Sequence, residues 1–308
     1  SPKDLTSSER RQLAEDFAFY LMTGVSGSSV ITAIDLVAAG FVSHWRSVVE
    51  KESLYKAINF IRAALSFKGI EISGMTGDPV ASYELAMEKF KSRKFISADE
   101  NPAKNASYVI NEERRVNLEF YKNALLNCLW SPALLAMSIL QGDDMKKISM
   151  EIVSKNFNYI KNLMRNEFIF DPLTSDEQLI ERDLRFFIES GWVSLSASFD
   201  AVNVIQMEAL EVFRGLILDL FAVYKACAGA LDSMGDEIIS EKDFIKLATK
   251  VAGELKLYPA EQNITLPRVT ARNALEEFSR LKIGEFNQAK KRVQRGKSSA
   301  SQVLDLKM

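Results

Sequence analysis

The single histidine, His44, is the side chain best suited to acid–base chemistry in this sequence, because imidazole titrates near neutral pH. A Ser-His-Asp or Cys-His arrangement would have to be built on it. His44 stands in the step Ser43-His44-Trp45-Arg46, directly after an apolar run with helical spacing. This position favours a structural histidine at the end of a helix over a catalytic base.

Metal and cofactor sites need sets of residues that this sequence lacks. Its two cysteines, Cys128 and Cys227, lie in apolar helical surroundings, which is typical of buried thiols in a reducing compartment. One histidine and two cysteines are too few for a four-ligand zinc site. The pair Asp143-Asp144 is as typical of a helix cap as of a cation site. The glycine-rich step Gly24–Ser28 lacks both the lysine of a Walker motif and a preceding strand. We therefore predict no metal and no cofactor.

A small basic cluster is the remaining candidate for binding chemistry. Lys89, Lys91, Arg93 and Lys94 lie at the end of a helix predicted over Val80–Lys91. Cations at a helix C-terminus interact favourably with the helix dipole, so a solvated helix end explains them. The alternative is a contact with an anionic ligand or with a membrane surface.

Overall composition narrows the class of protein. The chain has 308 residues, and 47% of them are apolar, which is ample for a folded core. Its formal net charge of −2 does not indicate the basic domain that nucleic-acid binding usually requires. We therefore expect a folded protein without a nucleic-acid partner.

The elements that must position any site are organised around one uncharged stretch. From Ala124 to Gly142 no residue is charged, in a sequence that is 26% charged overall. A membrane-spanning helix needs about 20 mostly apolar residues. Asn127, Ser131 and Pro132 would be costly against lipid. The pattern therefore favours a buried core helix over a membrane span.

Two long helical segments have boundaries that the sequence predicts. Because proline lacks a backbone donor and clashes with the preceding turn, Pro132 predicts a break between helices over Glu112–Trp130 and Pro132–Leu140. Further along, apolar residues at helical spacing predict one long helix over Val202–Leu231.

Hydrophobic spacing along the whole chain predicts a mainly α, multi-helix fold with a few short strands. Three times a helix is followed by a short apolar strand at a glycine, in Gly69–Ile72, Gly191–Ser194 and Ile283–Phe286. Helices followed by such strands occur in winged-helix modules, so we expect winged-helix-like helix–strand units. Without a basic recognition helix, these units are expected to pack against protein rather than to bind DNA.

The step Asp171-Pro172 predicts a boundary between two regions. We expect a first helical region over 1–170, centred on 112–140, and a second over 171–289 with the winged-helix-like pieces. From residue 290 the chain is basic and loses its periodicity, so 290–308 is predicted to be a disordered tail. Its cations include Lys290, Lys291, Arg292, Arg295 and Lys297.

Several motifs occur in the order found in one known protein family. The step Phe120-Tyr121-Lys122-Asn123, followed by Ser131-Pro132-Ala133-Leu134, resembles the C-terminal region of glycerol-3-phosphate acyltransferases of the bacterial membrane and mitochondrial type. In that family an aromatic-Tyr-basic-Asn-Asn step enters a helix. The similar segments on either side keep the family's order and are Ser26–Val30, Glu167–Phe170, Phe213–Tyr224 and Thr270–Ile283.

The resemblance suggests roles for the central motif. Tyr121, Lys122, Asn123 and Pro132 would form a structural junction or the edge of a domain interface. The alternative is that Lys122 faces an anionic substrate or lipid.

The catalytic motif of this family is absent. The family's chemistry rests on His-x-x-x-x-Asp, in which the aspartate orients the histidine as a general base toward the glycerol hydroxyl that attacks an acyl thioester. Here Val49 stands five residues after His44, and the Pro-Glu-Gly type motif is missing. Ala124 and Asn127 replace an asparagine and a histidine that are common in the family. The resemblance therefore implies a C-terminal half that is inactive on its own.

These observations lead to three competing hypotheses. The first is the non-catalytic C-terminal domain of a glycerol-3-phosphate O-acyltransferase, the enzyme of the first acylation step of phospholipid synthesis. It would pack on and stabilise an acyltransferase catalytic domain, in the same parent chain or a separate one, peripheral to the cytoplasmic side of a membrane. The second is a helical protein-interaction or regulatory module unrelated to lipid synthesis. The third is a standalone enzyme with a carboxylate- or lysine-based site.

Overall fold

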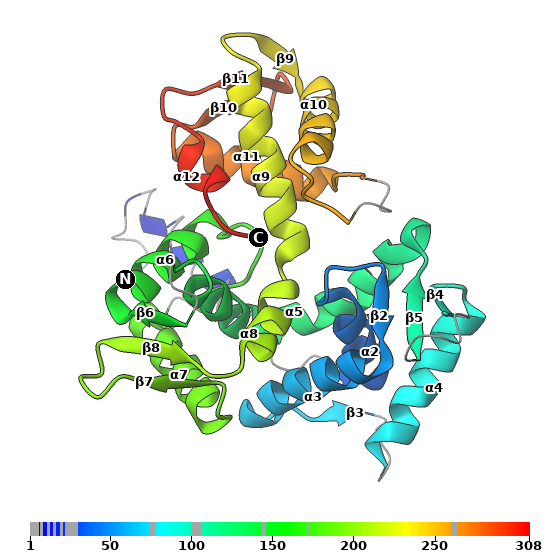
Figure 1. Ribbon diagram of the computed structural model, residues 1–308. Helices are drawn as coiled ribbons and strands as arrows, with labels where there is room; N and C mark the ends of the chain where they lie inside the picture. Colours follow the sequence, from blue (N-terminus) through cyan, green and yellow to red (C-terminus); the bar gives the residue numbers. More distant parts are fainter. Residues whose placement is uncertain are drawn as a thin grey trace.

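The chain is mainly α-helical, as predicted, with short strands in small sheets (Figure 1). The step Gly24–Ser28, most of Ser26–Val30, the pair Asp143-Asp144 and Pro172 lie outside the described residues. The computed structural model describes residues 30–73, 78–99, 106–142, 146–171, 173–259 and 264–308, together with Thr6, Glu9, Arg10, Leu13, Ala14, Phe17, Ala18 and Leu21.

Most of the described chain is built from one unit that occurs three times. Each unit runs helix, strand, helix, helix, strand, strand, and its first strand pairs with its last. This is the order of elements in a winged-helix module. In Figure 1 the first, second and third units occupy the lower right, the lower left and the top of the molecule. The predicted winged-helix-like units are therefore confirmed.

The three units follow one another along the chain. Unit 1 contains α2 (Ala33–Val42), β2 (Val48–Glu50), α3 (Lys51–Phe67), α4 (Pro79–Ser92), β4 (Ile96–Ala98) and β5 (Ser107–Ile110). Unit 2 contains α5 (Arg115–Ile139), β6 (Lys147–Ser149), α6 (Met150–Leu163), α7 (Asp176–Glu189), β7 (Val193–Leu195) and β8 (Ala201–Val204). Unit 3 contains α9 (Leu218–Ser233), β9 (Ile238–Ser240), α10 (Glu241–Glu254), α11 (Arg268–Arg280), β10 (Gly284–Asn287) and β11 (Arg292–Arg295). Outside the units lie β1 (Ile31–Thr32), β3 (Ile72–Ser73), the 3-10 turn η1 (Glu112–Arg114), α8 (Met207–Gly215) and α12 (Ser301–Leu304).

One backbone arrangement ends the third helix of every unit. A 2.9 Å hydrogen bond links an amide just past the helix to the carbonyl of a phenylalanine five residues earlier. The phenylalanines are at most 1% exposed. Each therefore anchors its helix in the core at the point where the wing, the hairpin of the last two strands, begins. The donor–acceptor pairs are Phe95–Phe90, Trp192–Phe187 and Ile283–Phe278.

The first of the three predicted repeats has the expected helix and strand, but it is not a wing. Gly69 follows α3, and Ile72 lies in β3, which pairs in parallel with β1. The wing of unit 1 begins after Lys94, whose φ of 58° is the left-handed conformation that Gly191 takes in unit 2 with a φ of 75°. Because a lysine takes this conformation here, the sequence has no glycine that would predict where this wing begins.

Lys282 takes the same left-handed conformation in unit 3, with a φ of 60°. Because this conformation costs a non-glycine residue about 1 kcal/mol, Lys282→Gly is expected to raise the free energy of unfolding by about that amount. Gly191→Ala is the matched reverse change, since a Cβ at Gly191 would have open space around it. It is expected to cost about 1 kcal/mol. Urea unfolding measures both, and equal stability of the three proteins would contradict the prediction.

Helix α5 runs through Pro132 without the predicted break. Every residue from Leu129 to Ile139 is buried. A proline inside a helix costs about 3 kcal/mol. The packing of α5 against α2, α6, α7 and α8 offsets that cost. The prediction of a buried core helix is confirmed, and among the described helices none is long and apolar enough to cross a membrane.

The single helix predicted over Val202–Leu231 was wrong. Its first residues belong to β8, and the two helices α8 and α9 follow. Helix α8 ends at Gly215, where a Cβ would lie 1.8 Å from the carbonyl oxygen of Ser43 in the loop after α2. The approach of this distant loop is a tertiary contact, so helical periodicity contains no sign of it.

The predicted disordered tail over 290–308 was also wrong. Strand β11 is the central strand of the unit 3 sheet, between β10 and β9. Val293 and Val303 are fully buried and tie this polar segment to the core. Ala300 and Leu306 are buried as well, but four apolar residues spread over this polar segment are too few to produce a clear periodic signal. The predicted boundary at residue 171 falls between α6 and α7 of unit 2, and the strands β6 and β8 on either side of it pair.

Candidate functional site

The family motif at the start of α5 contains a fully buried lysine. The ammonium nitrogen of Lys122 is 2.7 Å from Glu119 Oε2 and 2.7 Å from Asp219 Oδ1. Glu119 precedes Lys122 by one helical turn, so the two share a face of α5. Asp219 lies in the first turn of α9. These three side chains, the Lys122 cluster, join α5 to α9.

Two carboxylates share one ammonium in the Lys122 cluster. Burial alone would lower the pKa of Lys122, but the adjacent Asp219 and Glu119 outweigh it and raise that pKa. Burial raises the pKa of Glu119, against the opposing charge of Lys122. Lys122 therefore stays charged, and its charge is balanced inside the protein rather than offered to an anionic substrate.

The neighbours of Lys122 point elsewhere. The Tyr121 hydroxyl accepts a hydrogen bond from Arg93 Nη1 at 3.1 Å, and its ring lies 5.8 Å from the ring of Phe90, centroid to centroid. Tyr121 thus ties α5 to the end of α4. Asn123 is exposed and lines a cavity.

This cavity is a groove beside the Lys122 cluster, which we call the α5–α9 groove. It has a volume of about 770 Å³ and is formed by η1, α5, α9 and the segment that leads into α11. Phe120 and Val116 on its wall are 74% and 69% exposed. Large apolar side chains gathered at a cavity in this way are typical of a binding surface. The apolar lining residues include Val116, Phe120, Leu220, Val223 and Pro267.

Carboxylates also line the α5–α9 groove. The guanidinium of Arg115 forms a two-pronged ion pair with Glu112, with distances of 2.6 and 2.8 Å, so this pair adds no net charge. The other three carboxylates, those of Glu113, Glu119 and Asp219, are balanced only by the one ammonium group of Lys122, so the groove is acidic. A phosphate-bearing ligand would be repelled there, whereas an apolar surface that carries cations would be attracted. The carboxylates are Glu112, Glu113, Glu119 and Asp219.

A second buried polar cluster lies beside Pro132. Ser131 donates its hydroxyl to Asp183 Oδ2 on α7, and Asp183 is 1% exposed. Arg182 Nε lies 3.0 Å, and Lys68 Nζ 3.8 Å, from Asp183 Oδ1. The cluster ties α5 to α7 and to the end of α3. Ser131 is buried as well, so its hydroxyl is closed to solvent. The only sign of this cluster in the sequence is Asp183, a carboxylate at a helix position that faces the core.

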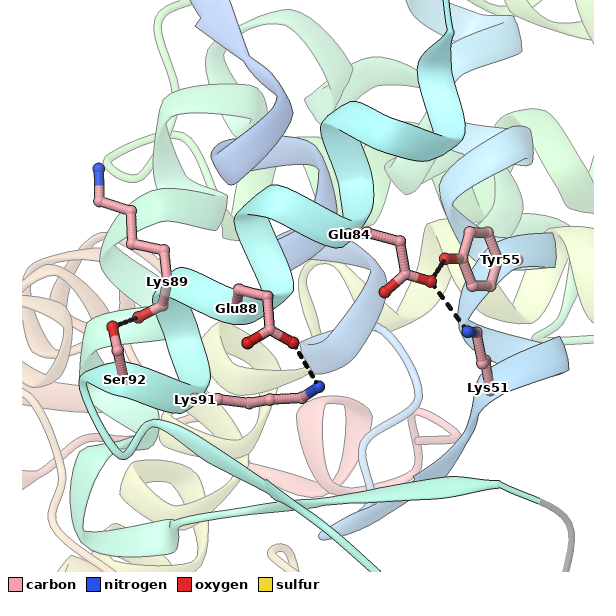
Figure 2. Close-up of polar contacts among 7 residues, drawn as sticks. All are labelled: Lys51, Tyr55, Glu84, Glu88, Lys89, Lys91 and Ser92. Atoms are coloured by element: carbon pink, nitrogen blue, oxygen red, sulfur yellow. Dashed lines mark hydrogen bonds and ion pairs between the residues drawn. The ribbon is translucent and has the colours of Figure 1, made fainter.

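The basic cluster at the end of α4 is divided between several roles. Lys91 Nζ is 2.8 Å from Glu88 Oε1, whereas Lys89 extends away from the other labelled side chains (Figure 2). Arg93 donates to α5, and Lys94 ends the helix in its left-handed conformation. Lys91 and Lys94 also line a cavity of about 530 Å³ against β4 and β5. Within the described part of the chain, the ammonium groups of Lys89 and Lys94 form no ion pair.

The other candidates for chemistry do not gather into a site. His44 lies just past the end of α2, as predicted, and burial lowers its pKa. Val49, five residues later, is a core residue. Cys128 and Cys227 are free thiols, and burial raises the pKa of both. Among the described residues, no group of three or more His, Cys, Asp or Glu could hold a metal ion.

A carboxylate with a raised pKa joins units 2 and 3. Glu167, just past α6, accepts a hydrogen bond from the hydroxyl of Tyr224 on α9 at 3.1 Å. Burial raises the pKa of Glu167 to about 7, against opposing hydrogen bonds from Asn273 and Tyr224, and the charge of Asp219 raises it further. Glu167 begins the segment Glu167–Phe170 that resembles the family in the sequence. Its raised pKa depends on contacts with α9 and α11, which the sequence does not show.

Glu167→Gln is expected to stabilise the protein at alkaline pH. The native carboxyl keeps its proton up to about pH 7, while the unfolded one loses it near pH 4.5. Its contribution to stability therefore falls as the pH rises between these values and levels off above them. The full span is worth about 3 kcal/mol. Unfolding measured from pH 4 to pH 8 should show equal stability at the acid end and the variant ahead by up to about 3 kcal/mol at pH 8. A difference that is constant with pH would contradict this.

Comparison with known proteins tests the resemblance seen in the sequence. A family model described as the glycerol-3-phosphate acyltransferase C-terminal region matches residues 1–280. The match spans the described chain up to the end of α11, including the Lys122 cluster and the α5–α9 groove. A search of curated proteins found no match to this chain. The chain therefore belongs to the family of glycerol-3-phosphate acyltransferase C-terminal regions.

Proposed function

We propose that this chain is the non-catalytic helical part of a glycerol-3-phosphate O-acyltransferase, and that it packs on and stabilises the acyltransferase catalytic domain. That domain lies in the same parent chain or in a separate one. The observation that carries the proposal is the α5–α9 groove. There, Phe120 and Val116 present exposed apolar surface on a helix that the Lys122 cluster holds in place.

The lining of the groove defines the chemistry of its partner surface. Interfaces place apolar anchors at their centre and complementary charges around them. The apolar and acidic side chains that line the α5–α9 groove therefore suit apolar side chains accompanied by lysine or arginine. We expect the catalytic domain to present such a surface.

The chain alone is expected to transfer no acyl group. His44 lacks the aspartate that would orient it as a base, since Val49 occupies that position. Ser131 is buried in the core and donates to Asp183, which is ion-paired with Arg182, so its hydroxyl is closed to a substrate. Acyl donor and acceptor would bind on the catalytic domain.

The test is the affinity of this chain for the acyltransferase domain of its own enzyme, measured by calorimetry. Phe120→Asp is expected to weaken binding about 100-fold, the effect of an interface anchor. Leu85→Asp is the matched control, because Leu85 is also 74% exposed but lies on α4. Equal weakening by both variants would contradict the location, and turnover by the chain alone would contradict the non-catalytic role. If the chain did not bind the acyltransferase domain at all, the result would favour the second hypothesis, a helical protein-interaction or regulatory module unrelated to lipid synthesis.

We also propose that the assembled protein lies peripheral to the cytoplasmic side of a membrane. The family resemblance supports this location. The vesicle measurements below test whether the chain binds a membrane surface.

A further inference from the structure

The wing of unit 3 carries a dense positive charge. Residues 282–297, which include β10 and β11, contain six cations and one carboxylate, in a chain whose net charge is −2. We call this segment the basic wing. Its cations are Lys282, Lys290, Lys291, Arg292, Arg295 and Lys297.

Most cations of the basic wing have no ion-pair partner in the described part of the chain. Arg295 Nη2 lies 3.0 Å from Asp232 Oδ1. The other five are exposed, and none forms an ion pair with another described residue. Like charges gathered on one hairpin repel one another. An anionic surface would relieve that repulsion, so the hairpin is suited to bind one.

The backbone of the basic wing is fixed by the core of unit 3. Phe286 and Val293 face each other across the hairpin, and Val293 is fully buried. The amide of Glu241 donates to the carbonyl of Lys291 at 2.9 Å, and the Gln288 side chain donates to Glu276 on α11. The cations are therefore held on an ordered hairpin rather than on a disordered tail.

The adjacent helix is not prepared for DNA. In DNA-binding modules of the helix-turn-helix type, a recognition helix enters the groove, and α11 has that position here. Arg268 and Arg272 on α11 both donate to Glu241, at 2.8 and 2.7 Å, and these bonds hold the pKa of Glu241 at about 2. Glu276 adds a carboxylate beside the wing. The two arginines of α11 are thus neutralised, whereas the neighbouring wing carries the densest run of exposed cations in this unit. This distribution suits a flat surface better than a groove.

We propose that the basic wing binds the surface of a membrane that contains anionic phospholipids, through the phosphate groups of the lipid headgroups. In Figure 1 the hairpin lies at the upper end of the molecule, away from α4, so the wing could contact a surface that the bulk of the protein does not touch. The site is distinct from the α5–α9 groove, and it does not rest on the docking of an acyltransferase domain.

Sedimentation with vesicles tests the proposal on the full chain. Vesicles of phosphatidylcholine with 30% phosphatidylglycerol are compared with pure phosphatidylcholine at low ionic strength. The wing variant is K290Q/K291Q/R292Q. One control with the same charge change is K242Q/K246Q/K250Q on α10, and a second is K89Q/R93Q/K94Q at the end of α4. All substituted residues are exposed, and thermal unfolding checks that each variant is folded.

The wild-type chain is expected to bind the anionic vesicles, to ignore the neutral ones and to dissociate as salt screens the charges. Loss of three cations is expected to weaken binding by the wing variant about 100-fold, and the controls should bind within about threefold of wild type. Failure to bind the anionic vesicles, or an equal loss in either control, would overturn the proposal. So would full competition by 10 mM inorganic phosphate, which would indicate an isolated phosphate site. Tighter binding to duplex DNA, lost in the wing variant, would assign the wing to nucleic acid instead.

Discussion

Replacement of Lys122 by methionine is expected to lower the free energy of unfolding by about 3–5 kcal/mol. Methionine has a similar length but no charge, so Glu119 and Asp219 would remain close together without a cation. Removal of one partner from a buried ion cluster leaves uncompensated charge in a poorly solvated site, and that charge is the source of the loss. Urea unfolding at pH 7 measures it.

Two further variants show whether the loss arises from the buried charge. Lys56→Met removes a lysine whose ion pair with Glu52 is solvent-exposed, 2.9 Å long and within one helix, so its effect should stay within about 0.5 kcal/mol. Glu119→Gln in the Lys122→Met background removes one of the two stranded carboxylates and should recover part of the stability. A Lys122→Met protein within about 1 kcal/mol of wild type would show that the cluster does not hold α5 on α9.

Gly215→Ala is expected to cost about 3 kcal/mol or more. A Cβ at this position would lie 1.8 Å from the carbonyl oxygen of Ser43 and 2.6 Å from its carbonyl carbon. Both contacts are with backbone, which cannot rotate away as a side chain can. Either α8 or the loop after α2 must shift, and each is packed against the core. Chemical unfolding provides the measurement.

Gly253→Ala is the matched control for this change. Gly253 also lies in the last turns of a helix, but a Cβ there would meet only Ile264 Cδ1 at 3.7 Å. Alanine is the better helix former by up to about 1 kcal/mol, so this variant should be as stable as wild type or more stable. If Gly215→Ala were equally neutral, the close approach of the loop to α8 would not exist in solution.

The predictable part of this fold consists of local features. The Ser175–Gln178 capping box that begins α7 is such a feature, because both partners of the cap lie within one turn. The uncharged stretch after Ala124 is a core helix, since its apolar content is visible in any window. The same kind of reasoning predicts a mainly α fold.

The unpredicted part consists of contacts between segments far apart in the chain. Pro132 leaves α5 unbroken because four other helices pack on it, and Gly215 ends α8 because a loop from unit 1 reaches it. Likewise, four buried apolar residues, which include Val293 and Val303, tie the segment after residue 290 to the core. Each outcome depends on a tertiary contact that local propensity does not contain.

The candidate site divides in the same way. The motif around Lys122 was identifiable from the order of residues, which also indicated a junction. Its partner Asp219 lies 97 residues further along the chain and could not be identified from the sequence. The groove beside it likewise requires α5, α9 and the segment before α11 to meet. Phe120 and Val116, large apolar residues that remain exposed, then support the proposal that a partner covers this surface.

Hydrogen exchange of this chain, with and without the acyltransferase domain of its enzyme, tests the docking surface most directly. Bound acyltransferase domain is expected to slow exchange in the walls of the α5–α9 groove, over residues 112–123, 219–223 and 265–270, and to leave α4 and α7 unchanged. Protection confined to α4 or α7, with the groove exchanging as fast as in the free chain, would contradict the account.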